Sequence, residues 1–141
     1  MKKIKSSTRK FQSPKGKFGQ TYRDFPVKGA PFELGWCSVK PGQANCPYHF
    51  HTAQWEMYVI LAGSGQVRTP KGRSHIRAGD IFMCPPHEAH QIINTGKRDL
   101  EYYVIADNPV SDSCHYPDSD KWLVDHRIIK GQRVPYLTGE E

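Results

Sequence analysis

Short apolar stretches separated by turn residues run through most of the chain. Residues 32–39 and 55–62 give the strongest strand signals, because aromatic and β-branched side chains are enriched in strands. Weaker strands are expected at 66–69, 73–77, 81–84, 90–94 and 101–106. Turn signals recur about every 6 to 12 residues, and this spacing predicts an all-β antiparallel sandwich or barrel.

Two histidines, His49 and His51, lie just before the strongest strand, and Glu56 lies near its start. Because side chains on a strand alternate between two faces, both imidazoles point to the same side. A short turn over 52–54 then lets the next strand bring Glu56 beside them. Two nitrogens and a carboxylate oxygen suit a borderline divalent metal. His-x-His pairs also occur on ordinary strands, so this stretch alone leaves a metal site and a structural role equally open.

A second stretch, residues 79–94, supplies a fourth candidate ligand. A Gly-Asp turn leads into an apolar strand, a Pro-Pro corner follows, and His90 begins the next strand. By the same period of two, His90 and Asn94 share a face.

Together the two stretches resemble the two sequence motifs of the cupin superfamily. The first motif, G-x5-H-x-H-x(3,4)-E-x6-G, is matched with one extra residue after the first glycine by Gly42, His49, His51, Glu56 and Gly63. The second, G-x5-P-x-G-x2-H-x3-N, is matched by Gly79, Pro85, His90 and Asn94. His87 stands where the second motif has its second glycine. The resemblance covers roughly residues 38–106.

The resemblance implies a double-stranded β-helix, or jelly-roll, cupin barrel over residues 29–108. A basic N-terminal arm (1–28) would precede it, and an acidic loop with a C-terminal extension (109–141) would follow. The expected cofactor is one divalent transition metal per chain: iron, manganese, nickel or zinc. Its expected ligands are His49, His51, Glu56 and His90.

The alternation along the strong strand makes two further predictions. If Glu56 faces the barrel interior, so does Tyr58, which either fills the barrel or acts as a catalytic proton donor near the substrate. Met57, Val59 and Leu61 then face outward. This outward row is apolar and needs a cover, which predicts a homodimer.

The net charge of +6 belongs to the N-terminal arm. Residues 1–28 contain nine Lys or Arg against one Asp, whereas residues 29–141 contain eleven against thirteen acids. A basic arm can bind nucleic acid, but no nucleic-acid-binding motif accompanies this one. We therefore expect a solvated tail, or a strand over 18–25 that is added to a partner subunit.

The chain contains no apolar run of about 18 residues and no apolar signal region, so we expect a cytoplasmic protein without a membrane partner. The four cysteines form no CxxC pair and are expected to be reduced. Two of them, Cys46 and Cys84, could approach the metal, although buried, inert thiols are the simpler expectation.

Residues 107–122 are rich in aspartate and contain two prolines, which predicts a loop. Its segment from Tyr116 to Lys121 resembles the Y-P-D-S-x-K signature that follows the barrel in a subgroup of small bacterial cupins. Members of that subgroup are often labelled sugar-phosphate isomerases. The loop could close over the cavity as a lid or pack on a neighbouring subunit.

Three functions follow from these observations. The favoured one is a mononuclear metalloenzyme that acts on a small polar substrate in the barrel, of isomerase or epimerase type on a sugar-phosphate-like compound, or an iron-dependent dioxygenase. The second is a non-catalytic module that binds or senses a small molecule or metal. The third, nucleic-acid binding through the basic arm, is the least favoured. Fold alone does not separate them.

Overall fold

The computed structural model describes residues 4–131, and every regular element in that range is a strand. The outer parts of the predicted arm (1–3) and of the predicted extension (132–141) lie outside the described residues. The strands are β1 (Ser7–Gln12), β2 (Gly19–Asp24), β3 (Phe32–Val39), β4 (Phe50–His51), β5 (Glu56–Ala62), β6 (Ser64–Thr69), β7 (Gly72–Arg77), β8 (Ile81–Cys84), β9 (Gln91–Ile93), β10 (Leu100–Asp107), β11 (Cys114–Tyr116), β12 (Lys121–Val124) and β13 (Arg127–Ile129). The prediction of an all-β fold is confirmed.

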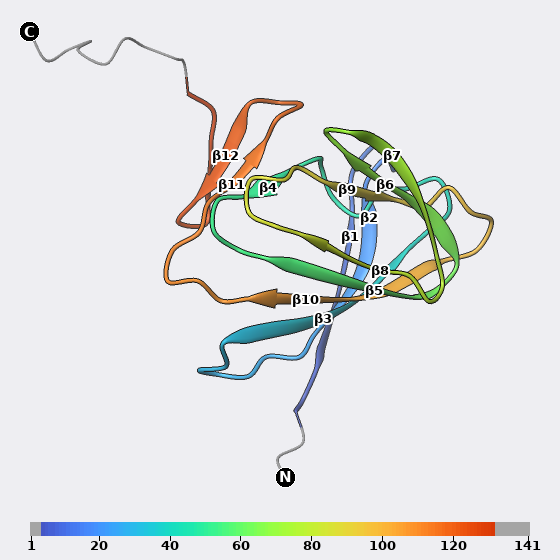
Figure 1. The fold of residues 1–141 in the computed structure, drawn as a ribbon, viewed down its shortest axis with the longest axis horizontal. Coiled ribbons are helices and arrows are strands. Elements are labelled where there is room, and N and C mark those ends of the chain that lie inside the picture. Colours follow the sequence, from blue (N-terminus) through green and yellow to red (C-terminus); the bar gives the residue numbers. More distant parts are fainter. Residues whose placement is uncertain (1–3, 132–141) are drawn as a thin grey trace, which may run out of the picture.

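The strands form three antiparallel sheets that wrap into one barrel (Figure 1). The largest has the order β1-β2-β3-β10-β5-β8, and the others are β13-β12-β11-β4 and β7-β6-β9. The buried core lies between the six-stranded and the three-stranded sheets. Its members are Cys37, Val39, Tyr58, Ile60, Cys84, Leu100 and Tyr102 from the first and Val67, Ile76 and Ile92 from the second.

The predicted alternation along β5 is present in the structure. Tyr58 and Ile60 point into the core and are each only 2% exposed. Leu61 is 40% exposed, and Met57 and Val59 are half-buried. Since Glu56 begins the same strand, its carboxylate and the Tyr58 hydroxyl lie on the interior face.

The basic N-terminal segment extends the six-stranded sheet. Its strand β2 pairs with β3 of the same chain, and β1 pairs with β2. A Cβ atom at Gly35 would collide with the hydroxyl group of Tyr22, so the glycine makes room for this ring across β3. A strand that we expected to add to a partner subunit therefore has a place in its own chain, where Tyr22 and Gln20 help to line the barrel interior.

The region after the barrel contains a strand where we expected only a loop. Strand β11 pairs with β4, with Cys114 opposite His51, and β12 and β13 continue this sheet at one end of the barrel (Figure 1). The His115 ring packs against Phe50 and Trp122, at centroid distances of 5.3 and 4.3 Å. Prolines and aspartates flank a three-residue strand too short to give a pattern of its own.

Among residues 4–131, no helix is long and apolar enough to cross a membrane.

Candidate metal centre

The four predicted ligands converge at one end of the barrel interior. His51 lies on β4, His49 forms a bridge with His90, and Glu56 begins β5. Glu56 Oε2 lies 2.9 Å from Nε2 of His90 and 3.8 Å from Nε2 of His51. The His49 ring centroid is 4.7 Å from that of His90 and 5.3 Å from that of His51. Local spacing and the pairing of distant strands thus bring four polar side chains to one point.

Each of the three histidines turns its Nδ1 atom away from this point and toward an oxygen. The distances are 2.9 Å from His49 to the Pro47 carbonyl, 2.5 Å from His51 to Asp112 Oδ2, and 3.2 Å from His90 to the Glu88 carbonyl. Because carbonyl and carboxylate oxygens only accept hydrogen bonds, Nδ1 must donate in each case. The three Nε2 atoms are therefore the ones that face Glu56, as in histidines that bind a metal.

Glu56 Oε2 is buried, and although His90 Nε2 lies 2.9 Å away, no donor among the described residues meets it with good hydrogen-bond geometry. A buried carboxylate oxygen without a partner is costly unless a cation balances it. The ligand atoms of His49, Glu56 and His90 lie within 4.8 Å of one another. These residues, with His51 beside them, could hold a divalent metal, and the nitrogen and oxygen donors fit iron, manganese, nickel or zinc.

The protonation of these groups follows from their burial and contacts. Burial, followed by the neighbouring His90, lowers the pKa of His49 to about 4, so His49 is neutral at pH 7. Burial raises the pKa of Glu56, but the close imidazoles, His90 foremost, lower it further, to about 2. Burial lowers the pKa of His90, but its contacts with Cys84 and Glu56 raise it to about 10. At neutral pH, Glu56 is an anion and His90 holds a proton that a metal would displace.

A cavity of about 140 Å³ adjoins the centre. His49, Glu56 and Tyr58 form one wall, and Tyr102 and Glu33 belong to the rest of the lining. Tyr58 Oη lies 3.1 Å from His90 Nε2. Burial, and then the charge of Glu56, hold the pKa of Tyr58 well above its ordinary value, so its hydroxyl stays protonated. Burial also holds the pKa of Tyr102 well above its ordinary value, so a second protonated hydroxyl lines the cavity.

Asp112 is a site residue that the sequence analysis missed. Besides His51, it receives hydrogen bonds from the backbone of Ala53 at 2.8 Å and Gln54 at 3.3 Å, and from Thr52 Oγ1 at 3.2 Å. It therefore fixes both the His51 ring and the turn between the histidines and Glu56. It lies 61 positions from His51, and no spacing rule connects them.

Three cysteines of the described chain lie near the candidate ligands: Cys46 beside His49 and Cys84 beside His90, which the sequence analysis named, and Cys114, which it did not. Cys46 Sγ lies 3.5 Å from His49 Nδ1, on the side of the ring turned away from Glu56. Cys84 is buried at the end of β8. Within the described residues, it is Cys114 whose sulfur groups with ring nitrogens of His49 and His51.

His87 shows how the chain departs from the second motif. It is exposed and adopts a φ of +66°, in the left-handed region that favours glycine. Its backbone N–H donates to the His51 carbonyl at 2.8 Å, which holds the Pro-Pro corner against β4. The turn geometry of the motif is therefore kept with a histidine in place of the glycine.

A family model for the cupin domain matches residues 35–106, about half of the chain. The chain belongs to the cupin family. This membership confirms the predicted barrel, and metal binding is typical of cupins.

Two curated relatives of this cupin are binding proteins by name. The oxalate-binding protein of Thermotoga maritima is 34% identical over 65 residues, which cover 46% of this chain and 54% of the relative. Auxin-binding protein 1 of Arabidopsis thaliana is 27% identical over 115 residues, which cover 75% of this chain and 56% of the relative. The cupin chain thus spans about half the length of these curated relatives.

Among solved structures, the cupin is similar to a candidate sugar phosphate isomerase of Acidithiobacillus ferrooxidans. The TM-score is 0.73 at 24% identity, over 83% of this chain and 81% of the other. At that identity, the likeness supports the fold.

Proposed function

We propose that this cupin is a mononuclear metalloenzyme of isomerase or epimerase type, with its metal held by His49, His51, Glu56 and His90. The observation that carries the proposal is the buried Glu56 oxygen, which lies 2.9 Å from His90 Nε2 and 3.8 Å from His51 Nε2 in the lining of a polar cavity. A divalent metal bound there would act as a Lewis acid that polarises a substrate carbonyl.

The surrounding side chains supply the groups that such chemistry needs. Tyr58 stays protonated and would donate a hydrogen bond to a substrate oxygen. Glu33 lines the cavity, where partial desolvation of its carboxylate, and then the charges of Asp24 and Glu56, raise its pKa. Its carboxylate would take a proton from the hydroxyl-bearing carbon beside the carbonyl and return it to the former carbonyl carbon. The hydroxyl proton would pass to the former carbonyl oxygen, so that aldose and ketose interconvert without loss of any atom.

The cavity favours a small substrate without a phosphate group. A cavity of about 150 Å³ holds a molecule the size of benzene, so about six non-hydrogen atoms suit the 140 Å³ observed. Among the described residues, the lining contains two carboxylates, Glu33 and Glu56, and no lysine or arginine. A phosphate dianion would lack the cationic partner that such groups require when buried. We therefore propose a short hydroxyaldehyde or hydroxyketone as the substrate class.

The test uses protein purified without a metal-binding tag, stripped with chelator and reloaded with manganese, zinc or nickel. We expect isomerisation of three- to four-carbon aldoses and ketoses, and at least tenfold lower kcat/KM for their phosphorylated counterparts. Tyr58→Phe should lower kcat about tenfold or more with metal content unchanged. His90→Ala should lower metal occupancy at least tenfold while the barrel still folds. Tyr103→Phe, on the outward face of β10, is the matched control and should retain full activity.

Three outcomes would overturn this proposal. One is equal activity of the Tyr58→Phe variant, and another is wild-type metal content in His90→Ala after chelation and reloading. The third is stoichiometric iron in the protein as purified, with oxygen consumed in the presence of small acids, thiols or catechols. That result would favour the dioxygenase.

A non-catalytic binding module is the second candidate, because both curated relatives are named for what they bind. Under this alternative, a small polar ligand would bind to the metal-loaded protein and be recovered unchanged. Saturable binding by calorimetry, without turnover of any aldose or ketose, would favour it.

A further inference from the structure

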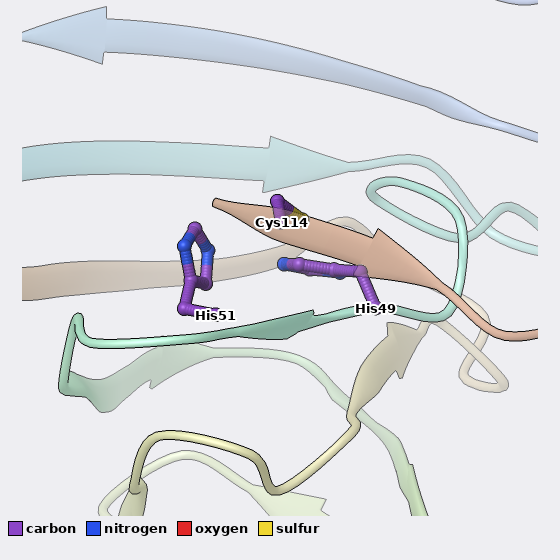
Figure 2. A group of neighbouring side chains, drawn as sticks. All are labelled: His49, His51 and Cys114. Carbon is purple, nitrogen blue, oxygen red and sulfur yellow. The ribbon is translucent and has the colours of Figure 1, made fainter. Parts of the chain in front are cut away.

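A buried thiol lies at the edge of the candidate metal centre. Cys114, on β11, is directly opposite His51 on β4 and is 4% exposed. Its sulfur and ring nitrogens of His49 and His51 lie within 4.8 Å of one another. Figure 2 shows the three side chains together, the two imidazoles from one segment of chain and the cysteine from the neighbouring strand.

The thiol is held in place by the same segment that holds a histidine of the centre. Asp112, two residues before Cys114, binds Nδ1 of His51. The N–H of Ser113 between them donates to Thr52 Oγ1 at 2.9 Å. Residues 112–114 therefore fix both the His51 ring and the sulfur position, and little rearrangement is needed for both to reach one ion.

The described residues thus contain two overlapping sets of ligand atoms that share His49. One is completed by Glu56 and His90 and offers nitrogen and oxygen, and the other is completed by His51 and Cys114 and offers nitrogen and sulfur. Oxygen donors suit manganese and other hard cations, whereas thiolates select zinc, copper(I) and other soft ones. The two sets therefore differ in the metal that each prefers.

We propose that Cys114 gives this centre a second mode of coordination, in which His49, His51 and the Cys114 thiolate bind a thiophilic cation such as zinc. Manganese uses the oxygen of Glu56 instead. As the metal–sulfur bond forms, the thiol proton leaves to solvent. This inference rests on the part of the proposed function that makes His49 and His51 ligands, and it is independent of the reaction.

X-ray absorption spectroscopy at the metal edge tests the proposal on the full-length, reduced protein. Zinc-loaded wild type should show a sulfur shell at about 2.3 Å beside nitrogen at about 2.0–2.1 Å. Manganese-loaded wild type should show nitrogen and oxygen neighbours with no sulfur. Cys114→Ser should lose the zinc–sulfur shell and bind zinc at least tenfold more weakly, with manganese affinity unchanged within about twofold. Cys37→Ser, which removes another buried thiol, should leave zinc binding unchanged.

The inference is overturned if zinc-loaded wild type shows no sulfur shell, or if that shell persists in Cys114→Ser. The wild-type spectrum decides even if the variant fails to fold. Glu56→Gln separates the two proposals, because it should weaken manganese binding at least tenfold and leave the zinc–sulfur shell intact. Absence of a sulfur shell from zinc-loaded wild type, with manganese-dependent turnover retained, would refute this inference and leave the proposed function standing.

Discussion

In each histidine of the centre, a hydrogen bond from Nδ1 to an oxygen fixes the proton on that nitrogen. The oxygen is the Pro47 carbonyl for His49, the Glu88 carbonyl for His90 and the Asp112 carboxylate for His51. Three independent hydrogen bonds thus set the same result: Nδ1 keeps its proton, and Nε2 is the atom directed inward. This arrangement makes metal binding a competition with protons at Nε2. The competition should be visible as a dependence on pH.

We expect metal affinity to rise with pH across the neutral range. The pKa of His90 is raised to about 10, so in metal-free protein at pH 7 this ring carries a proton on Nε2 that binding must release. His49, with a pKa lowered to about 4, releases none above that pH. Between these values the release of the His90 proton alone should increase the affinity about tenfold per pH unit.

Isothermal calorimetry with manganese at pH 6, 7 and 8 measures this slope. Pairs of buffers that differ in ionisation enthalpy count the protons released. An affinity that is flat between pH 6 and 8, with no release, would contradict the assigned protonation of His90.

The resemblance to the second cupin motif predicted His90. Spacing along the chain was sufficient to predict that His49, His51 and Glu56 lie together, because a period of two and a short turn bring such residues to one point. It was not sufficient for Asp112, whose contact with His51 depends on how the chain returns after the barrel. Cys114 was missed for the same reason. The positive φ of His87 was likewise beyond the sequence, since histidine rarely adopts it.

Strands β11, β12 and β13 support the segment of chain that carries His49 and His51. Strand β4 has only two residues and gains its neighbour from β11, which β12 and β13 support in turn. A strand this short is marginal without partners. These three strands therefore stabilise the position of His49 and His51.

Two strands were predicted with accurate bounds, 32–39 and 81–84, and the strong strand expected at 55–62 begins one residue later, at Glu56. They carry the clearest periodicity because one face of each is buried. The sheet of β4, β11, β12 and β13 was not predicted, since β4, β11 and β13 have two or three residues each and little periodicity.

Asp112→Asn should lower manganese affinity about 10- to 100-fold without unfolding the protein. The amide oxygen can still accept from the backbone N–H of Ala53, which keeps the turn. Its NH₂ group would face His51 Nδ1 and favour the tautomer with the proton on Nε2, which cannot bind a metal.

Asp120→Asn is the matched control, because Asp120 contacts the peripheral His115 at 3.3 Å. A metal titration monitored by competition with a chromogenic chelator measures both variants, and circular dichroism reports the fold. Equal affinities of wild type and Asp112→Asn would show that the carboxylate has no role in orienting His51.

The outer face of the six-stranded sheet is apolar over several strands. On β8, Ile81 is 65% exposed and Met83 is 53% exposed. They pair directly with Val59 and Met57 on β5. A contiguous exposed apolar surface of this kind favours association.

We propose that two copies of the chain associate through this face as a homodimer, related by a twofold axis. Sedimentation velocity should find a dimer at micromolar concentration, and Ile81→Lys should weaken association at least tenfold, because a charge would be buried at the contact. Val110→Lys is the control, since Val110 is fully exposed and lies outside this sheet. A wild-type protein that sediments as a monomer at every concentration would refute the dimer.

The contact between Asp112 and His51 has a consequence for how the protein is made. The two residues are 61 positions apart, so at about 5–20 residues per second the ribosome adds Asp112 roughly 3 to 12 s after His51. For the last 22 residues of that interval, after His90 has been added, the nascent chain contains all the predicted histidine ligands but not the carboxylate that orients one of them. Metal captured early would be held loosely and could exchange, so the ion retained would be chosen only after synthesis has passed the barrel.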